Sequence, residues 1–217
     1  MTNADLTHLY FLLDRSGSMN TIVEDTVGGF DAFIAEQRKT AGECKVTLAQ
    51  FDDAYEEVYV DRPIAEVPSL VLVPRGTTAL LDSIGRLVVD AGKRLAAMPE
   101  GERPGTVIVG IMTDGMENAS QEWTHDQVKQ LIERQTDVYQ WQFLYLGADQ
   151  DAIEVGARIG VGAAHSVTYG RGKVKQALAA TAANVSRYRD ARAAGMPAPA
   201  AAQVAGFTEE QRRSMSE

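Results

Sequence analysis

The sequence predicts an α/β fold with a doubly wound, mostly parallel central sheet, one antiparallel edge strand and helices on both faces. Short apolar runs alternate with helical stretches along most of the chain, which is typical of a parallel sheet covered by helices. Two consecutive strand-like segments are separated only by a short Asp-rich turn and predict an antiparallel hairpin. The chain has 217 residues, of which 45% are apolar and 24% charged, so it can build one sizeable core.

The first half of the chain begins with a continuous apolar run, which is typical of a strand buried on both faces. Thr21 and Glu24 form a capping-box pair before the first helical stretch. The second helical stretch ends before Pro99, which cannot continue a helix. The expected elements are a strand at 8–13, a helix at 22–40, strands at 46–51 and 55–60, and a helix at 79–98.

The second half continues the alternation and contains the most apolar strand of the chain, at 107–112. Thr124 and Gln127 form another capping box. The remaining expected elements are a helix at 124–135, a strand at 138–146, a helix at 152–159, a strand at 165–169 and a helix at 173–192. This order predicts a Rossmann-like architecture over residues 1–192.

The last 25 residues differ in composition from the rest. Residues 193–205 are rich in Ala and Pro and predict a linker, after which Thr208 and Gln211 can cap a short helix. A helix of this length is unstable alone. We therefore expect a domain at 1–192 and, at 193–217, a linker with a short helical tail that is either docked on the domain or free to meet a partner.

Charge and cysteine content exclude several function classes. The chain carries 21 Lys and Arg against 30 Asp and Glu, a net charge of −9, which argues against nucleic acid or an anionic membrane as partner. Cys44 is the only cysteine, which excludes a disulfide framework and a Cys-rich metal site.

No charged-then-apolar leader opens the sequence, and no apolar run reaches the ~18–20 residues that span a bilayer. We expect a cytoplasmic protein.

The charge is unevenly distributed along the chain. Residues 1–170 have a net charge of −13 and residues 171–217 a net charge of +4. The basic end predicts either a second contact with a partner or docking on the acidic body. The stretch 51–61 contains five carboxylates and no basic residue. It indicates a solvated, charged hairpin edge, with a site for a cation or a basic partner as the alternative.

Hydroxyl and carboxylate residues gather in the loops that follow two of the predicted strands. Asp14, Ser16 and Ser18 follow the first strand, and Asp114 follows the strand at 107–112. The loop before the second helix adds the neighbouring hydroxyls of Thr77 and Thr78. Ligands of open α/β sheets bind at the carboxyl ends of the strands, and ligand sets made only of oxygen suit a hard cation such as Mg²⁺.

This combination resembles the metal-ion-dependent adhesion site of the von Willebrand factor A (vWA) domain family, Asp-x-Ser-x-Ser…Thr…Asp-Gly. The segments that carry it read YFLLDRSGSM, RGTTALLDSIG and VIVGIMTDGMEN, and the resemblance extends over about residues 6–170. It is strongest to stand-alone bacterial and phage-type domains. The resemblance implies five metal ligands, with Thr77 as the alternative to the fourth: Asp14, Ser16, Ser18, Thr78 and Asp114.

The resemblance also implies a function. Such sites bind Mg²⁺, with Mn²⁺ or Ca²⁺ as substitutes, and an Asp or Glu of a partner protein completes the coordination. We therefore expect a Mg²⁺-dependent protein-binding module without catalytic or cofactor-binding residues. One alternative is a metal-dependent hydrolase or phosphoryl-transfer enzyme, against which Ser16 stands where an aspartyl-phosphate enzyme needs a second carboxylate. The other is a structural assembly component whose metal site has decayed.

Three further features have ordinary structural interpretations. Asp149 and Asp151 follow the strand at 138–146 and indicate helix capping, with the rim of the metal site as the alternative. Trp123 follows the second metal loop and indicates packing, or a flank of the site. Cys44 indicates a small apolar filler at the start of a strand. The three histidines have no metal-ligand spacing.

Overall fold

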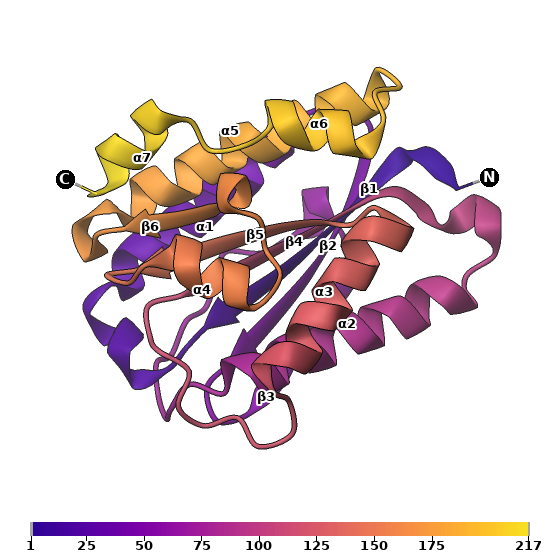
Figure 1. Cartoon of the computed structure of the whole chain (residues 1–217). Coiled ribbons are helices and arrows are strands. Elements are labelled where there is room, and N and C mark those ends of the chain that lie inside the picture. Colours follow the sequence, from indigo (N-terminus) through magenta and orange to yellow (C-terminus); the bar gives the residue numbers. More distant parts are fainter. Residues whose placement is uncertain (1, 217) are drawn as a thin grey trace.

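The computed structural model describes residues 2–216 and shows a six-stranded sheet between two layers of helices (Figure 1). The strand order is β3-β2-β1-β4-β5-β6. The strands are β1 (Asn3–Asp14), β2 (Glu43–Phe51), β3 (Tyr55–Pro63), β4 (Pro104–Thr113), β5 (Gln142–Ala148) and β6 (Ser166–Tyr169). The main helices are α1 (Val23–Gln37), α2 (Leu80–Ala97), α3 (His125–Tyr139), α4 (Ala152–Arg158), α5 (Val174–Ala193), α6 (Ala198–Val204) and α7 (Glu209–Ser216).

The sheet is mostly parallel, as the sequence predicts. β1 pairs in parallel with both β2 and β4, and the pairs β4–β5 and β5–β6 are also parallel. Only β3 runs antiparallel, as the outer strand of the hairpin with β2. Helices cover both faces, which confirms the doubly wound α/β fold class.

Strand β1 lies at the centre and shows why both faces must be covered. Side chains of successive strand residues point to opposite faces. Phe11 and Leu13 pack with α1 and α5 on one face, whereas Tyr10 and Leu12 pack with α2 and α3 on the other. All four side chains are buried. This burial on both faces explains why the sequence of β1 contains one continuous apolar run.

Several element boundaries differ from the sequence prediction, and two of the differences have a clear local cause. The Thr21 capping box does not form, because residues Gly17–Thr21 make a 3₁₀ helix and α1 is preceded by Ile22 instead. The strand expected at 138–146 begins at Gln142, because α3 continues through the exposed Tyr139 and ends at a left-handed Gln140. The Thr124–Gln127 capping box is confirmed.

The C-terminal segment is docked on the domain. Helix α6 forms within the stretch expected as a linker, and both α6 and α7 pack against α5. Ala201 and Met215 are fully buried. Gln211 N–H donates to Thr208 Oγ1 at 3.2 Å, and Thr208 N–H donates to Gln211 Oε1 at 2.9 Å, which confirms the expected cap. The division into a domain at 1–192 and a separate segment at 193–217 stays a prediction.

Three arginines near the end of the chain, Arg189, Arg192 and Arg212, donate hydrogen bonds to backbone carbonyls. Arg212 donates to the carbonyls of Ser166 and Ala163, both at 2.6 Å. Arg192 donates to the Gly105 carbonyl at 3.1 Å. Charged donors make stronger hydrogen bonds than neutral ones, so Arg212 contributes to the docking of α7 on the domain.

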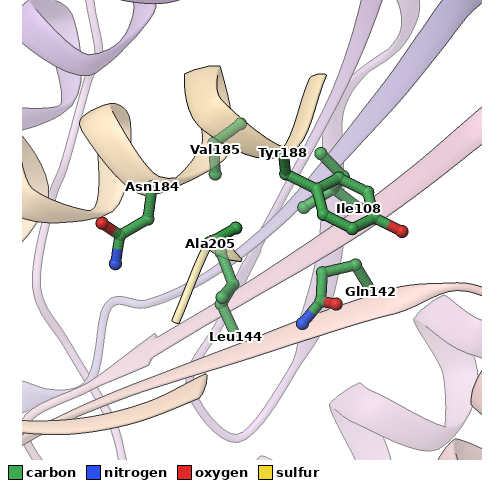
Figure 2. Close-up of a pocket in the computed structure, with 7 residues that line it drawn as sticks. All are labelled: Ile108, Gln142, Leu144, Asn184, Val185, Tyr188 and Ala205. Carbon is green, nitrogen blue, oxygen red and sulfur yellow. The ribbon is translucent and has the colours of Figure 1, made fainter. Parts of the chain in front are cut away.

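Figure 2 shows how closely the C-terminal region meets the sheet. Val185 and Tyr188 of α5 and Ala205 after α6 line a small pocket together with Ile108 of β4 and Leu144 of β5. These residues belong to one apolar cluster that includes Phe207 and Met215.

Within residues 2–216, no helix is both long and apolar enough to cross a membrane.

We predict that removing residues 194–217 lowers the free energy of unfolding by at least about 3 kcal/mol, because the burial of apolar area by Phe207 and Met215 against the domain is lost. Urea denaturation of the truncated and full chains measures the difference. An unchanged midpoint and slope would contradict the docking of this segment.

Candidate metal centre

The two loops with the predicted carboxylates meet at one edge of the sheet. β1 and β4 are adjacent and parallel, with Leu13 opposite Met112. Asp14 is the last residue of β1, and Asp114 directly follows β4. Parallel neighbours bring their carboxyl ends together. The pairing of β1 and β4 therefore places both carboxylates at the centre of the same edge.

Hydrogen bonds connect the loop after β1, called the first loop below, to the ends of both β1 and β4. Asp14 Oδ1 accepts from the Ser16 N–H at 2.6 Å, and its Oδ2 accepts from the Thr113 hydroxyl at 2.6 Å. Ser16 Oγ lies 3.0 Å from Ser18 Oγ, which donates to Asp114 Oδ1 at 2.5 Å. Four of the five predicted ligands thus belong to one network.

The fifth predicted ligand, Thr78, lies beside this network. Thr78 is buried, whereas the alternative residue Thr77 is exposed. The Thr78 N–H donates to Asn118 Oδ1 at 3.0 Å, and the Asn118 N–H donates back to the Thr78 carbonyl at 3.1 Å. This reciprocal pair holds the loop before α2 against the loop after β4.

Gly115 marks a small space among the predicted ligands. A Cβ added to Gly115 would lie 2.9 Å from Thr78 Oγ1, 3.4 Å from Ser18 Oγ and 3.6 Å from Asp14 Oδ2. Oxygens from the loop after β1 and the loop before α2 therefore line a space that a methyl group would fill. Asp114 Oδ2 is buried and has no hydrogen-bond partner. Oxygen donors and one unsatisfied carboxylate oxygen fit a small hard cation.

The candidate site contains few charged ligands. Its five predicted ligands are two carboxylates and three hydroxyls, and among residues 2–216 no group of three or more His, Cys, Asp or Glu side chains is arranged to hold a metal. Burial raises the pKa of Asp14, an increase that the hydrogen bonds from Thr113 and Ser16 oppose and the charge of Asp114 reinforces. Burial likewise raises the pKa of Asp114, against the effects of Ser18 and Arg171. A bound cation would relieve this cost of burying two negative charges.

An ion-pair network that the sequence did not predict supports the first loop. Asp52 Oδ2 lies 3.0 Å from Arg15 Nε and 2.8 Å from Arg75 Nε. Burial would raise the pKa of Asp52, but hydrogen bonds from Arg75, from the Ala54 N–H and from Arg15 outweigh it and lower the pKa. Asp52 thus stays charged and ties the loop after β1 to the loop before α2.

Backbone hydrogen bonds reinforce this connection. The Arg75 N–H donates to the Arg15 carbonyl at 2.8 Å, and the Gly17 N–H donates to the Gly76 carbonyl at 3.2 Å. Gly76 has a φ of 67°, a left-handed conformation that favours glycine. The loop with Thr78 is therefore held in register with the loop of Ser16 and Ser18.

The acidic stretch 51–61 is only partly the solvated edge that the sequence indicated. It forms the β2–β3 hairpin at the edge of the sheet, as expected. However, Asp52 is fully buried, and Glu57 pairs with Arg94 at 2.7 Å. The sequence around Asp52 does not indicate that its side chain is buried, because its partners Arg15 and Arg75 are distant in sequence.

The loop after β4 is fixed to the start of α2 by carboxylates that the sequence analysis did not single out. Glu117 Oε2 accepts from the Leu81 N–H at 2.9 Å, and Asp82 Oδ1 accepts from the Trp123 N–H at 2.8 Å. Asp82 lies in the first turn of α2, which is a recognisable signal, whereas Glu117 lies in a loop and gives none. The Trp123 ring packs over Gly85, where a Cβ would collide with it, which supports the packing interpretation.

Asp149 and Asp151 have different roles. Asp151 caps α4 by accepting from the N–H groups of Ile153 and Glu154, as the sequence predicts. Asp149 instead lies 3.2 Å from Arg171, whose guanidinium is also 3.5 Å from Asp114 Oδ2. Asp149 therefore belongs to the rim of the candidate site. Sequence reasoning missed Arg171 as a neighbour of the site.

Comparisons with known proteins identify the fold. No protein-family model matches the sequence, and no curated protein matches it. Among solved structures, the chain is similar to the ArnB paralog VWA2 from Sulfolobus acidocaldarius, with 14% identity and a TM-score of 0.53 over 80% of this chain and 44% of that protein. It is also similar to the vWF domain of the type V pili tip protein Mfa5 from Porphyromonas gingivalis, with 10% identity and a TM-score of 0.57 over 82% and 94% of the two chains.

A third similar structure is the pilus adhesin SpaC from Lactobacillus rhamnosus GG, with 12% identity and a TM-score of 0.60 over 83% of this chain and 30% of that protein. The chain spans less than half the length of the Sulfolobus and Lactobacillus proteins. At these identities the similarity concerns the fold alone. The chain has the vWA fold, as the resemblance of its motifs implied.

We predict that Asp14→Asn stabilises the cation-free protein. The amide keeps the size of the side chain and removes a buried charge whose hydrogen bonds come from uncharged groups. A gain of about 1 kcal/mol corresponds to a rise of about 2–4 °C in melting temperature for a chain of this size. Thermal unfolding in EDTA measures it, and a large fall would show that Asp14 has a structural role.

Proposed function

We propose that this domain with the vWA fold is a Mg²⁺-dependent protein-binding module. In this proposal Asp14, Ser16, Ser18, Thr78 and Asp114 hold the cation, and an Asp or Glu of a partner protein completes its coordination. Mn²⁺ or Ca²⁺ would substitute for Mg²⁺. The observation that carries the proposal is the space beside Gly115, which oxygens of Thr78, Ser18 and Asp14 line next to the unsatisfied Asp114 Oδ2.

The chemistry of these ligands supports binding of an external carboxylate. Hydroxyl groups donate less charge to a cation than carboxylates do, so a site whose two carboxylates only neutralise a divalent ion leaves that ion electron-poor. Mg²⁺ also keeps several waters in protein sites. A negatively charged side chain that replaces such a water gains a strong electrostatic interaction in a partly desolvated place.

Two further observations favour binding over catalysis. Ser16 stands two residues after Asp14, where phosphoryl-transfer enzymes with an aspartyl nucleophile need a carboxylate as acid and base. Two of the similar structures come from pilus proteins, one of them described as an adhesin. The net charge of −9 also favours a protein partner over nucleic acid or an anionic membrane.

We expect wild-type protein to bind Mg²⁺ and Mn²⁺ in a calorimetric titration, and Asp14→Ala and Asp114→Ala to bind neither, because each removes a carboxylate of the proposed site. The partner is then sought by capture from a lysate of the source organism with wild type in Mg²⁺, wild type in EDTA, and Asp14→Ala. A protein held only by wild type in Mg²⁺ would support the proposal. Equal capture under all three conditions would reject the cation-bridged mechanism.

We also predict that Gly115→Ala lowers Mg²⁺ affinity about tenfold or more, because its methyl group would occupy the lined space 2.9 Å from Thr78 Oγ1. Gly162→Ala is the matched control, since a Cβ there meets nothing within 4 Å and its φ of −65° suits alanine. Circular dichroism checks the fold of both variants. Equal Mg²⁺ affinity of the two variants would contradict the location of the site.

A further inference from the structure

Arg171 reaches the candidate metal centre from a part of the chain far from its ligands. It lies in the 3₁₀ turn Arg171–Lys173 between β6 and α5. The N–H of the preceding Gly170 donates to the Met215 carbonyl of α7 at 2.9 Å, which fixes the start of this turn. The Arg171 side chain is 43% exposed, so its guanidinium borders solvent on one side.

On its other side, this guanidinium faces the buried carboxylate of Asp114. Arg171 Nη2 is 3.5 Å from Asp114 Oδ2, and the Asp114 side chain is fully buried. That oxygen has no hydrogen bond. Within residues 2–216, Arg171 is the one cationic group within 4 Å of Asp114. Arg171 therefore supplies the positive charge that the buried carboxylate lacks.

Asp149 holds Arg171 at this position. Its Oδ2 lies 3.2 Å from Arg171 Nε, and its N–H donates to the Tyr169 carbonyl at 3.0 Å. Asp149 has a left-handed backbone with a φ of 48°, which is uncommon for a residue other than glycine. Asp149 is half-exposed and Asp114 is buried, so the guanidinium joins an outer and an inner carboxylate.

We propose that Arg171 is the internal counterion of the metal site and competes with the divalent cation for Asp114. The guanidinium stabilises the cation-free site, and its charge opposes an incoming cation, so the cation binds more weakly than the oxygen ligands alone would allow. This inference rests on the proposed function of the site. It assigns Arg171 a positioning role, because the residue acts on the cation through Asp114.

The proposal predicts that Arg171→Ala binds Mn²⁺ about three- to tenfold more tightly than wild type. Two charges a few ångströms apart near a protein surface interact by about 1 kcal/mol or more, and each ~1.4 kcal/mol is a tenfold change in affinity. Arg171→Lys, which keeps the charge, should bind Mn²⁺ nearly as wild type does. The measurement is a titration with Mn²⁺ alone, followed by the loss of the free-ion electron paramagnetic resonance signal.

The matched control is Arg158→Ala, which removes the same charge from the exposed surface of α4, where Arg158 pairs with Glu154. The titrations are made at low and at high ionic strength. The Debye length falls from ~10 Å at 0.1 M salt to ~3 Å at 1 M, so an electrostatic effect of the half-exposed Arg171 must shrink. A purely structural effect would persist at high salt.

The outcomes separate this inference from the proposed function. Tighter Mn²⁺ binding by Arg171→Ala alone, reduced at high salt and reversed in Arg171→Lys, would support the counterion role. Equal affinity of Arg171→Ala, Arg158→Ala and wild type would overturn it and leave the proposed cation site intact. Weaker binding by Arg171→Ala would also overturn it. If wild type binds no Mn²⁺, or Asp14→Ala binds it equally well, both the site and the inference are wrong.

Discussion

The parallel pairing of β1 with β4 is the constraint on which the candidate site depends. It brings Asp14 and Asp114, which are 100 positions apart in the sequence, to neighbouring strand ends at the centre of the sheet. Both strands must be covered on both faces, because their side chains alternate between two apolar layers. The same burial that makes this pairing stable also removes the two carboxylates from water. The fold therefore creates the site and its electrostatic cost together.

The loops around the site compensate this cost in three ways. Hydroxyl and amide donors of the first loop and of Thr113 hold the two carboxylates. Arg171 supplies a positive charge near the oxygen of Asp114 that has no donor. The Asp52 network holds the two surrounding loops in place with buried charges of its own. These compensations all come from the chain itself, and they leave oxygens of Thr78, Ser18 and Asp14 grouped around Gly115.

Much of this structure follows from local sequence patterns. The continuous apolar run of β1 and the Thr124–Gln127 capping box predicted their elements because both signals are local. The positions of the loops after β1 and β4 also predicted that their hydroxyls and carboxylates meet, since parallel strands end at one edge, whereas the preference for Thr78 over Thr77 came from the family resemblance. Partners distant in sequence were not predictable. No residue near Asp52 in the sequence indicates its ion pair with Arg75, and none near Asp114 indicates its ion pair with Arg171. Helix α6 forms within the Ala- and Pro-rich stretch that was expected to be a linker. The reason is related, because α6 is stabilised by α5 rather than by its own sequence.

The C-terminal segment and the candidate site share one turn. The Met215 carbonyl of α7 accepts from the Gly170 N–H, and the next residue is Arg171. Met215 is fully buried, and Arg212 anchors the same helix to carbonyls beside β6. A helix of eight residues is unstable alone, so its position depends on this docking. The turn that presents Arg171 to Asp114 is consequently held from outside the sheet. The docked C-terminal helix thus influences the candidate site through the position of one guanidinium.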